Sequence, residues 1–269
     1  MAARFIAFLS DFGLRDDFVG TCHGVMKRIA PDVQIIDVTH GIEPQQVLQG
    51  ALVLANTLRY MPVGVHLAVV DPGVGGSRRP LALRDDEGRL YVGPDNGLLV
   101  TAAEAGGGID AAHELANPEY ALQPVSRTFH GRDLFAPAAA HLATGVALDR
   151  LGPPLDPELL VRLALPEPSL DTQEIRATAL SVDRFGNVQL SLDGDQLARA
   201  GAVPGSRVEL RLDESRRPAV VVRTFSDVAP GDVVLYENSY GRIGIAISRG
   251  NAAQELGLRP GEAVWIDVR

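Results

Sequence analysis

The chain has 269 residues, is 46% hydrophobic and carries a formal net charge of −9, which argues against a nucleic-acid partner. The length suffices for one large domain or two smaller ones with sizeable cores. Before Ser10 the apolar run is only Phe5–Leu9, too short for a signal sequence or a membrane span. The single cysteine, Cys22, excludes an internal disulfide and a cysteine-based zinc site. We expect a cytoplasmic protein without a membrane partner.

Apolar runs alternate with helical periods through the first half of the chain. Strands are predicted at Phe5–Leu9, Val33–Val38 and Val65–Val70. One helix is predicted to begin after Asp16 or Asp17, and a second helix is predicted at Val47–Tyr60. This alternation predicts an α/β domain with a central, mostly parallel sheet and flanking helices. Cys22 lies on the apolar stripe of the first helix, so we expect it in the core.

Polar side chains follow each of these three strands, namely Asp11, His40 and Asp71. Ligands of parallel sheets bind outside the carboxyl ends of the strands, so a shared crevice is predicted there. Asp71 opens the stretch VVDPGVGGSRRP, in which bare glycine backbone leads to Arg78 and Arg79. The alternative for this stretch is a solvated turn with a basic exit.

The next segment contains a predicted hairpin, Leu81–Arg84 with Leu90–Val92, and then the turn-like stretch GPDNG at 93–97, which leads into Leu98–Ala105. Residues 106–127 are expected to be loops. His130 lies near the start of an alanine-rich helix that runs to about Leu142. The helix dipole there disfavours imidazolium, so His130 should be neutral and able to accept a proton. We expect the remaining histidines, His23, His66, His113 and His141, to be structural, apart from His40.

The composition changes at LPEPSLDTQ, which predicts an N-terminal domain over 1–165, a linker over 166–175 and a C-terminal domain over 176–269. Short apolar runs separated by turn residues predict a smaller all-β barrel in the last part. These runs are Ala177–Val182, Val188–Leu192, Val208–Leu212, Ala219–Val222, Val233–Tyr236, Ile243–Ile247 and Ala263–Val268.

Two groups of loops in this part combine aromatic, amide and acidic residues. They are DRFGN at 183–187, and NSYGR at 238–242 with GNAA at 250–253. Such loops can hold a planar heterocycle by stacking and edge hydrogen bonds, although ordinary turn chemistry is the alternative. The sequence has neither GxGxxG opening a helix nor a P-loop, a GxSxG elbow or HExxH, which argues against the enzyme classes that use them. Nothing in it argues for a metal.

Seven motifs occur together and in order: SDFGLRDDFVG, DVTHGI, VVDPGVGGSRR, GPDNGLL, TFHGRDLFAPAAAHL, DRFGN and NSYGRIGIA–GNAA. From Phe5 to about Ala253 the chain resembles the S-adenosylmethionine hydroxide adenosyltransferases, which are relatives of fluorinase and chlorinase. The resemblance implies an α/β domain and a β-barrel domain assembled as a homotrimer, with each site between neighbouring subunits. It also implies that water displaces methionine from the ribose C5′ of S-adenosylmethionine without any cofactor.

The resemblance places the catalytic set on Asp71, Arg78 and His130. Asp71 and His130 would orient the attacking water and accept its proton, and Arg78 would hold Asp71 or favour the developing hydroxide. The register of the motif favours Arg78 over Arg79. The residues do not reveal which group takes the proton.

The resemblance also assigns substrate-binding residues. In the N-terminal part, Asp11 would accept hydrogen bonds from the ribose hydroxyls, and Asp16 and the backbone at Phe18 would meet the methionine end. In the C-terminal part, the expected methionine contacts are Asp183, Asn187 and Ser239, and the expected adenine contacts are Phe225, Asn187 and Ala252.

Departures from the halogenating relatives favour water as the nucleophile. Those relatives replace the acid at the position of Asp71, and have tryptophan at Gln45, a hydroxyl residue at Val74 and an insertion at Asp85–Gly88. A halide is disfavoured beside a carboxylate. In the DRFGN loop this chain is one residue shorter than the halogenating relatives. Two alternatives stay open: a halogenase that uses the same substrate, and a non-catalytic trimer that binds adenosine or S-adenosylmethionine.

Overall fold

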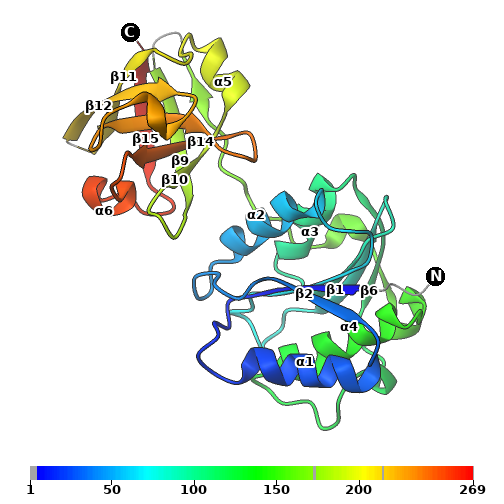
Figure 1. Cartoon of the computed structure of the whole chain (residues 1–269). Coiled ribbons are helices and arrows are strands. Elements are labelled where there is room, and N and C mark those ends of the chain that lie inside the picture. Colours follow the sequence, from blue (N-terminus) through cyan, green and yellow to red (C-terminus); the bar gives the residue numbers. More distant parts are fainter. Residues whose placement is uncertain (1–4, 172–173, 214, 269) are drawn as a thin grey trace. The chain divides into compact units, whose positions relative to one another are not determined.

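The computed structural model describes residues 5–171, 174–213 and 215–268. The chain forms two compact units, Met1–Leu163 (the N-terminal unit) and Ala164–Arg269 (the C-terminal unit), each with its own fold (Figure 1).

The N-terminal unit contains a sheet with the strand order β2-β1-β3-β5-β4-β6-β7. Its parallel part comprises β1 (Phe5–Ser10), β2 (Gln34–Thr39), β3 (Val65–Val69) and β5 (Leu90–Pro94). The antiparallel extension comprises β4 (Pro80–Asp85), β6 (Ile109–Glu114) and β7 (Pro154–Leu155). The predicted α/β class and the predicted hairpin, which is β4–β5, are both confirmed.

Helices cover both faces of this sheet (Figure 1). On one face α1 (Phe18–Ile29) and α4 (Ala136–Ala143) share a core with Phe8. On the other face α2 (Val47–Leu58) and α3 (Leu98–Ala105) share a core with Leu9. The side chains of consecutive strand residues thus point into opposite cores, as the pleat requires, and this explains why the strands are apolar throughout.

Cys22 is fully buried in the first of these cores, as predicted. Burial raises the pKa of its thiol to about 12. The thiol is therefore protonated at neutral pH and serves as a small apolar residue rather than a nucleophile.

One local expectation is wrong, because residues 106–127 include β6, whose sequence IDAAHE lacks the apolar run by which strands are recognised. The predicted helix after His130 is confirmed, and its first part is a π-helical turn, η2 (Gly131–Phe135), which continues as α4. The remaining short helices of the unit are η1 (Pro118–Tyr120), η3 (Leu148–Leu151) and η4 (Pro157–Leu159).

The C-terminal unit is a barrel, as predicted. The sheet runs β10-β14-β13-β12-β11-β15-β9-β8, and a further β9–β10 pairing closes seven of these strands on themselves. The strands are β8 (Ser169–Leu170), β9 (Glu174–Val182), β10 (Val188–Asp193), β11 (Arg207–Leu212), β12 (Ser215–Val222), β13 (Val233–Glu237), β14 (Arg242–Ile247) and β15 (Ala263–Val268). Three short helices were not predicted: α5 (Gly194–Arg199), η5 (Phe225–Asp227) and α6 (Ala252–Leu256).

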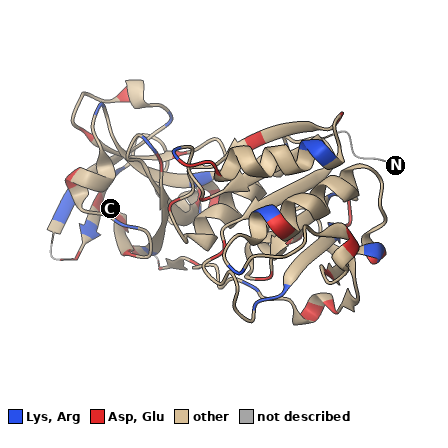
Figure 2. Cartoon of the chain, turned by 90° about the horizontal axis from the view of Figure 1, so that it is seen from below, with Lys and Arg blue, Asp and Glu red and all other residues tan. Residues whose placement is uncertain are grey.

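Acidic and basic positions are interspersed along the ribbons of both units (Figure 2). Among the described residues, none of the helices combines the length and the apolar composition that crossing a bilayer requires.

His66 generates a prediction about stability. Its ring is fully buried in β3 and stacks on Tyr91 at 5.2 Å between ring centroids, and neither ring nitrogen has a hydrogen-bond partner among the described residues. Burial lowers the pKa of His66 to about 4, below its value in the unfolded chain. The folded state thus favours neutral His66, and this contribution is complete above pH 6.5 and is lost as the pH falls toward 4.

The contribution of neutral His66 to the free energy of unfolding is on the order of 3 kcal/mol. In the variant His66→Phe, the stability of the N-terminal unit should fall less between pH 6.5 and 4.5 than in the unmodified protein. Urea unfolding at a series of pH values measures this difference. Parallel stability profiles for the two proteins would show that His66 does not cause the acid sensitivity.

Candidate active site

Asp71 follows β3 and begins the turn that carries Arg78 back over it. The carboxylate is only 6% exposed. Arg78 Nε donates to Asp71 Oδ1 at 3.0 Å, and Arg78 Nη2 donates to Oδ2 at 2.5 Å. Gly73 lies against the Arg78 side chain, where a Cβ would approach Arg78 Cγ to 3.2 Å. The glycine-rich turn thus folds a guanidinium onto the acid at the strand's end in bidentate geometry.

His130 joins this pair from a segment 52 residues away. Arg78 Nη2 lies 2.7 Å from His130 Nδ1. A guanidinium can only donate, so Nδ1 accepts and the neutral ring carries its proton on Nε2. Burial lowers the pKa of His130, and the positive charge of Arg78 lowers it further. This lowered pKa agrees with the predicted neutral imidazole, and burial and Arg78 are its principal causes.

The structure separates the two neighbouring arginines. Arg79 Nε donates to Asp95 Oδ2 at 2.9 Å, and Arg79 Nη2 donates to the carbonyl of Leu159 at 2.9 Å. Only Arg78 reaches Asp71 and His130, in agreement with the register of the motif.

The segment before His130 is held by a residue that the sequence analysis missed. Asp133 is 1% exposed, and its Oδ2 accepts the backbone N–H of Ser126 at 2.8 Å. Arg132 neutralises its charge, with Nε donating to Oδ1 at 2.6 Å. The burial of Asp133 arises from tertiary packing, so the GRD sequence after His130 gave no local signal for it.

Asp11, His40 and Asp71 do follow adjacent strands, because the sheet runs β2-β1-β3. Asp11 Oδ2 accepts the backbone N–H of Gln45 at 2.9 Å. The His40 ring, however, is buried and hydrogen-bonded to Ser10. The expectation that all three side chains share a crevice is therefore wrong for His40.

Asp16 and Phe18 lie at the start of α1, and both are exposed. The Phe18 ring packs edge-on against Phe129, the residue before His130, at 5.1 Å between centroids. Phe12 contacts both rings, at 5.9 and 5.8 Å. This aromatic cluster connects the loop after β1, where Asp11 and Asp16 lie, to the His130 segment.

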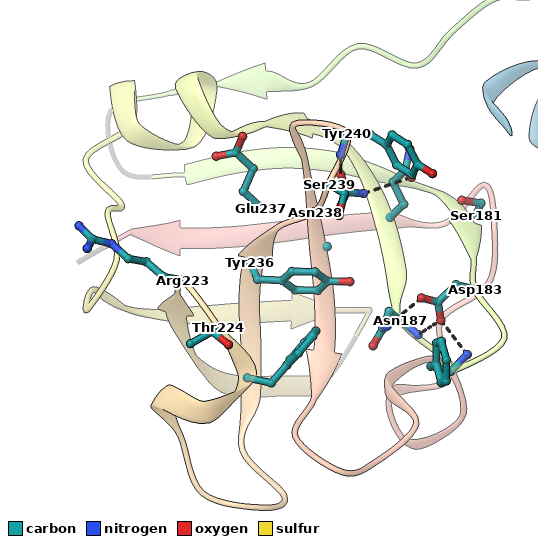
Figure 3. Close-up of a pocket in the computed structure, with 14 residues that line it drawn as sticks. Ser181, Asp183, Asn187, Arg223, Thr224, Tyr236, Glu237, Asn238, Ser239 and Tyr240 are labelled. Atoms are coloured by element: carbon teal, nitrogen blue, oxygen red, sulfur yellow. Dashed lines mark hydrogen bonds between the residues drawn. The ribbon is translucent and has the colours of Figure 1, made fainter. Parts of the chain in front are cut away.

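Four of the five residues predicted in the C-terminal unit line one pocket of about 530 Å³: Asp183, Asn187, Phe225 and Ser239 (Figure 3). Ala252, the fifth, is fully buried as the first residue of α6 and belongs to the barrel core. It is not among the residues that line the pocket.

Hydrogen bonds within the DRFGN loop fix its shape. Asp183 Oδ1 accepts the backbone N–H groups of Phe185 and Asn187 at 2.8 and 2.9 Å, and Oδ2 accepts Asn187 Nδ2 at 2.8 Å. Gly186 has a φ of +83° and lies so close to Asn251 that a Cβ would come within 2.2 Å of it. The two loop groups singled out in the sequence thus meet at Gly186.

Tyr236 is a pocket residue that the sequence analysis missed. Its ring lies 4.8 Å from that of Phe225, and Figure 3 shows it extending toward the side where Asp183 and Asn187 lie. Burial, with the negative charge of Asp183, raises the pKa of Tyr236 to about 12. Gly244, opposite on β14, leaves room for this ring.

A polar cluster at a strand's carboxyl end and a partly aromatic pocket on a barrel together describe an enzyme for a small organic substrate. The chain belongs to the SAM hydroxide adenosyltransferase family. The model of the family's N-terminal domain matches residues 6–152, and that of its C-terminal domain matches residues 177–265.

Several relatives match along nearly their full length. A protein from Salinispora tropica named (R)-S-adenosyl-L-methionine hydrolase is 49% identical over 97% of both chains. The Thermus thermophilus protein of the same name is 40% identical over 97% of this chain and 98% of its own. A fluorinase from Actinopolyspora mzabensis is 29% identical over 97% of this chain and 96% of its own.

Two solved structures share the fold of this chain. The crystal structure of a conserved protein from Thermotoga maritima has a TM-score of 0.91 and 35% identity, covering 97% of this chain and 99% of its own. The crystal structure of a conserved protein from Thermus thermophilus has a TM-score of 0.78 and 38% identity, covering 98% of this chain and 99% of its own.

Gly75 provides a test of how the cluster is assembled. It has a φ of +74°, and a Cβ there would lie 2.2 Å from the carbonyl oxygen of Arg127. Gly75→Ala should push the turn away from the His130 segment and weaken the Arg78–His130 contact. The pKa of His130, measured by NMR titration, should then rise toward its ordinary value.

Gly88→Ala is the matched control, because Gly88 has a similar φ of +85° but nothing within 4 Å of a Cβ. It should cost about 1 kcal/mol of stability through backbone strain and leave the His130 titration unchanged. An unchanged titration in Gly75→Ala as well would contradict the assembly described here.

Proposed function

We propose that this protein hydrolyses S-adenosylmethionine by attack of water at the ribose C5′, giving adenosine and L-methionine. The observation that carries the proposal is the Asp71–Arg78–His130 cluster. It occurs in a chain whose relatives at 40–49% identity are named (R)-S-adenosyl-L-methionine hydrolases.

The reaction needs little more than a well-placed water. The water oxygen bonds to C5′ as the C5′–S bond breaks, and the electron pair of that bond stays on sulfur. The sulfonium thereby leaves as a neutral thioether and needs no general acid, and one proton is released. We therefore propose that the enzyme works without a cofactor.

The cluster offers this water one acceptor and one donor. Asp71 keeps lone pairs beyond those used by Arg78, and His130 presents Nε2–H because its Nδ1 accepts from Arg78. We assign the acceptance of the water proton to Asp71, since neither nitrogen of His130 has a free lone pair in this arrangement. Arg78 fixes both groups and is the positioning cation.

Substrate binding is assigned to both units. In the N-terminal unit, Asp11 would hold the ribose hydroxyls, and Asp16 with the backbone at Phe18 would hold the methionine end. In the C-terminal unit, the proposed contacts are Asp183, Asn187, Ser239 and, for adenine, Phe225. Phe225 is suited to stacking because the residue is 44% exposed and its ring packs against that of Tyr236. Ala252 is assigned no side-chain contact.

We further propose a homotrimer in which the N-terminal unit of one subunit and the C-terminal unit of its neighbour complete each site. The family resemblance supports this assembly. A cytoplasmic location belongs to the same proposal, and the one cysteine, which is free and buried, is consistent with it.

Product analysis tests the reaction itself. Incubation with S-adenosylmethionine in ¹⁸O-labelled water should yield methionine and adenosine labelled at its 5′-hydroxyl. A parallel incubation with chloride should give no 5′-chloro-5′-deoxyadenosine. Formation of that product would identify a halogenase, and binding without methionine release over hours would identify a non-catalytic protein.

Asp71→Asn tests the assigned proton acceptor. The amide keeps the size of the side chain but takes up a proton poorly, so kcat should fall by about 10²–10⁴-fold. The dissociation constant for S-adenosylmethionine should change far less. Rapid-quench kinetics and calorimetric titration measure the two quantities, and equal losses in both would reassign Asp71 to binding.

Complementation tests the shared site. One variant carries Asp71→Asn and the other carries both Asn187→Ala and Phe225→Ala, and each alone should be nearly inactive. After joint refolding in equal amounts, about a quarter of interfacial sites should combine two unaltered halves and regain activity. If each site lies within a single chain, no activity returns.

A further inference from the structure

We propose that His23, Asp37 and His40 form a transition-metal site in the N-terminal unit, separate from the Asp71–Arg78–His130 cluster. His23 lies on α1, Asp37 lies in β2, and His40 directly follows β2. One potential ligand atom from each residue lies within 4.8 Å of the other two. His23 Nε2 is 2.9 Å and His40 Nε2 is 3.1 Å from Asp37 Oδ1.

A metal-free network leaves part of this cluster unsatisfied. The His40 side chain is 3% exposed, and its Nδ1 lies 2.8 Å from Ser10 Oγ. Its Nε2 is close to Asp37 Oδ1 but outside hydrogen-bond geometry, and it has no hydrogen-bond partner among the described residues. A buried polar atom without a partner is costly, whereas a bound cation would satisfy it.

Ser10 orients His40 in the way that partners of metal-bound imidazoles usually do. When His40 Nδ1–H donates to Ser10 Oγ, the lone pair is on Nε2, which faces Asp37. Ser10 Oγ also accepts the backbone N–H of Phe12 at 3.2 Å, which fixes the hydroxyl. The tautomer that a metal ligand requires is therefore compatible with the local hydrogen bonds.

The donor set indicates the class of metal. Two imidazoles and one carboxylate favour Zn²⁺ and its first-row neighbours over Mg²⁺ and Ca²⁺. Ligand atoms around tetrahedral Zn²⁺ lie roughly 3.3 Å apart, so the two short distances to Asp37 need to lengthen by only a few tenths of an ångström. His23 and Asp37, with side chains 31% and 41% exposed, leave access for the ion and an open coordination position.

The site would connect α1 to the end of β2 beside the loop that follows β1. The backbone N–H of Gly13 in that loop donates to the carbonyl of His40 at 2.7 Å. We infer that bound metal stabilises the N-terminal unit at this corner. This inference does not depend on the hydrolase proposal.

Metal titration of the full chain, prepared without a histidine tag and treated with chelator, tests the site. Zn²⁺ in competition with a chromophoric chelator should bind at one ion per chain, and Co²⁺ should give the visible spectrum of a low-coordinate imidazole site. His23→Gln and Asp37→Asn should each weaken Zn²⁺ binding at least tenfold. Asp32→Asn is the control, because Asp32 is an exposed acid just before β2.

Thermal unfolding gives a second readout. Zn²⁺ should raise the melting temperature of the unmodified protein and of Asp32→Asn, but not that of Asp37→Asn. Circular dichroism verifies that each variant is folded. The proposal is overturned if Zn²⁺ does not bind at millimolar concentration, or if Asp37→Asn and His23→Gln bind it as tightly as the unmodified chain.

Discussion

The Arg78 guanidinium is the contact on which the candidate active site depends. It donates to Asp71 through two nitrogens and to His130 through one of them, and so fixes two groups that lie far apart in the sequence. The Asp71 carboxylate is nearly buried, and removing the partner of such a charge typically costs about 3–5 kcal/mol. Positioning of the cluster and stability of the strand's end therefore rest on one side chain.

The surrounding backbone is shaped to bring this cation into place. Gly73 leaves room for the Arg78 side chain, and Gly75 allows the turn to approach the carbonyl of Arg127. The Asp133 carboxylate accepts a hydrogen bond from the backbone N–H of Ser126, and this contact fixes the segment that leads to His130. The Asp71 turn and the His130 segment are thus each shaped by local contacts in addition to the hydrogen bonds of Arg78.

Much of the fold could be predicted because its strands are continuous apolar runs broken by Gly, Pro, Asp and Asn. The barrel strands were all recognisable in this way, whereas β6 was not, since IDAAHE has neither an apolar run nor clear alternation. The short helices α5 and α6 were missed because five or six residues are too few to show a helical period.

The candidate site was predictable only where residues stand in motifs. Asp71, Arg78 and His130 were found through motif register, but Tyr236 and Asp133 matter through tertiary neighbours that no local pattern encodes. The same holds for His23, Asp37 and His40. Their spacing matches no ligand motif, and they meet because the fold places His23 of α1 beside Asp37 of β2.

The electrostatics of the cluster also bear on the choice of nucleophile. Both arginines of the motif are paired with carboxylates, Arg78 with Asp71 and Arg79 with Asp95. The positive charge beside Asp71 is thus already compensated, and His130 is neutral because burial and Arg78 lower its pKa.

A halide ion would have to lose its hydration shell on entering this site. It would gain no net positive charge in return and would lie next to a carboxylate, so its binding would cost considerable free energy. Water meets no such penalty, since it is neutral and needs both a donor and an acceptor. One carboxylate at the end of β3 therefore disfavours a halide, and in the proposed reaction it would also serve as the base.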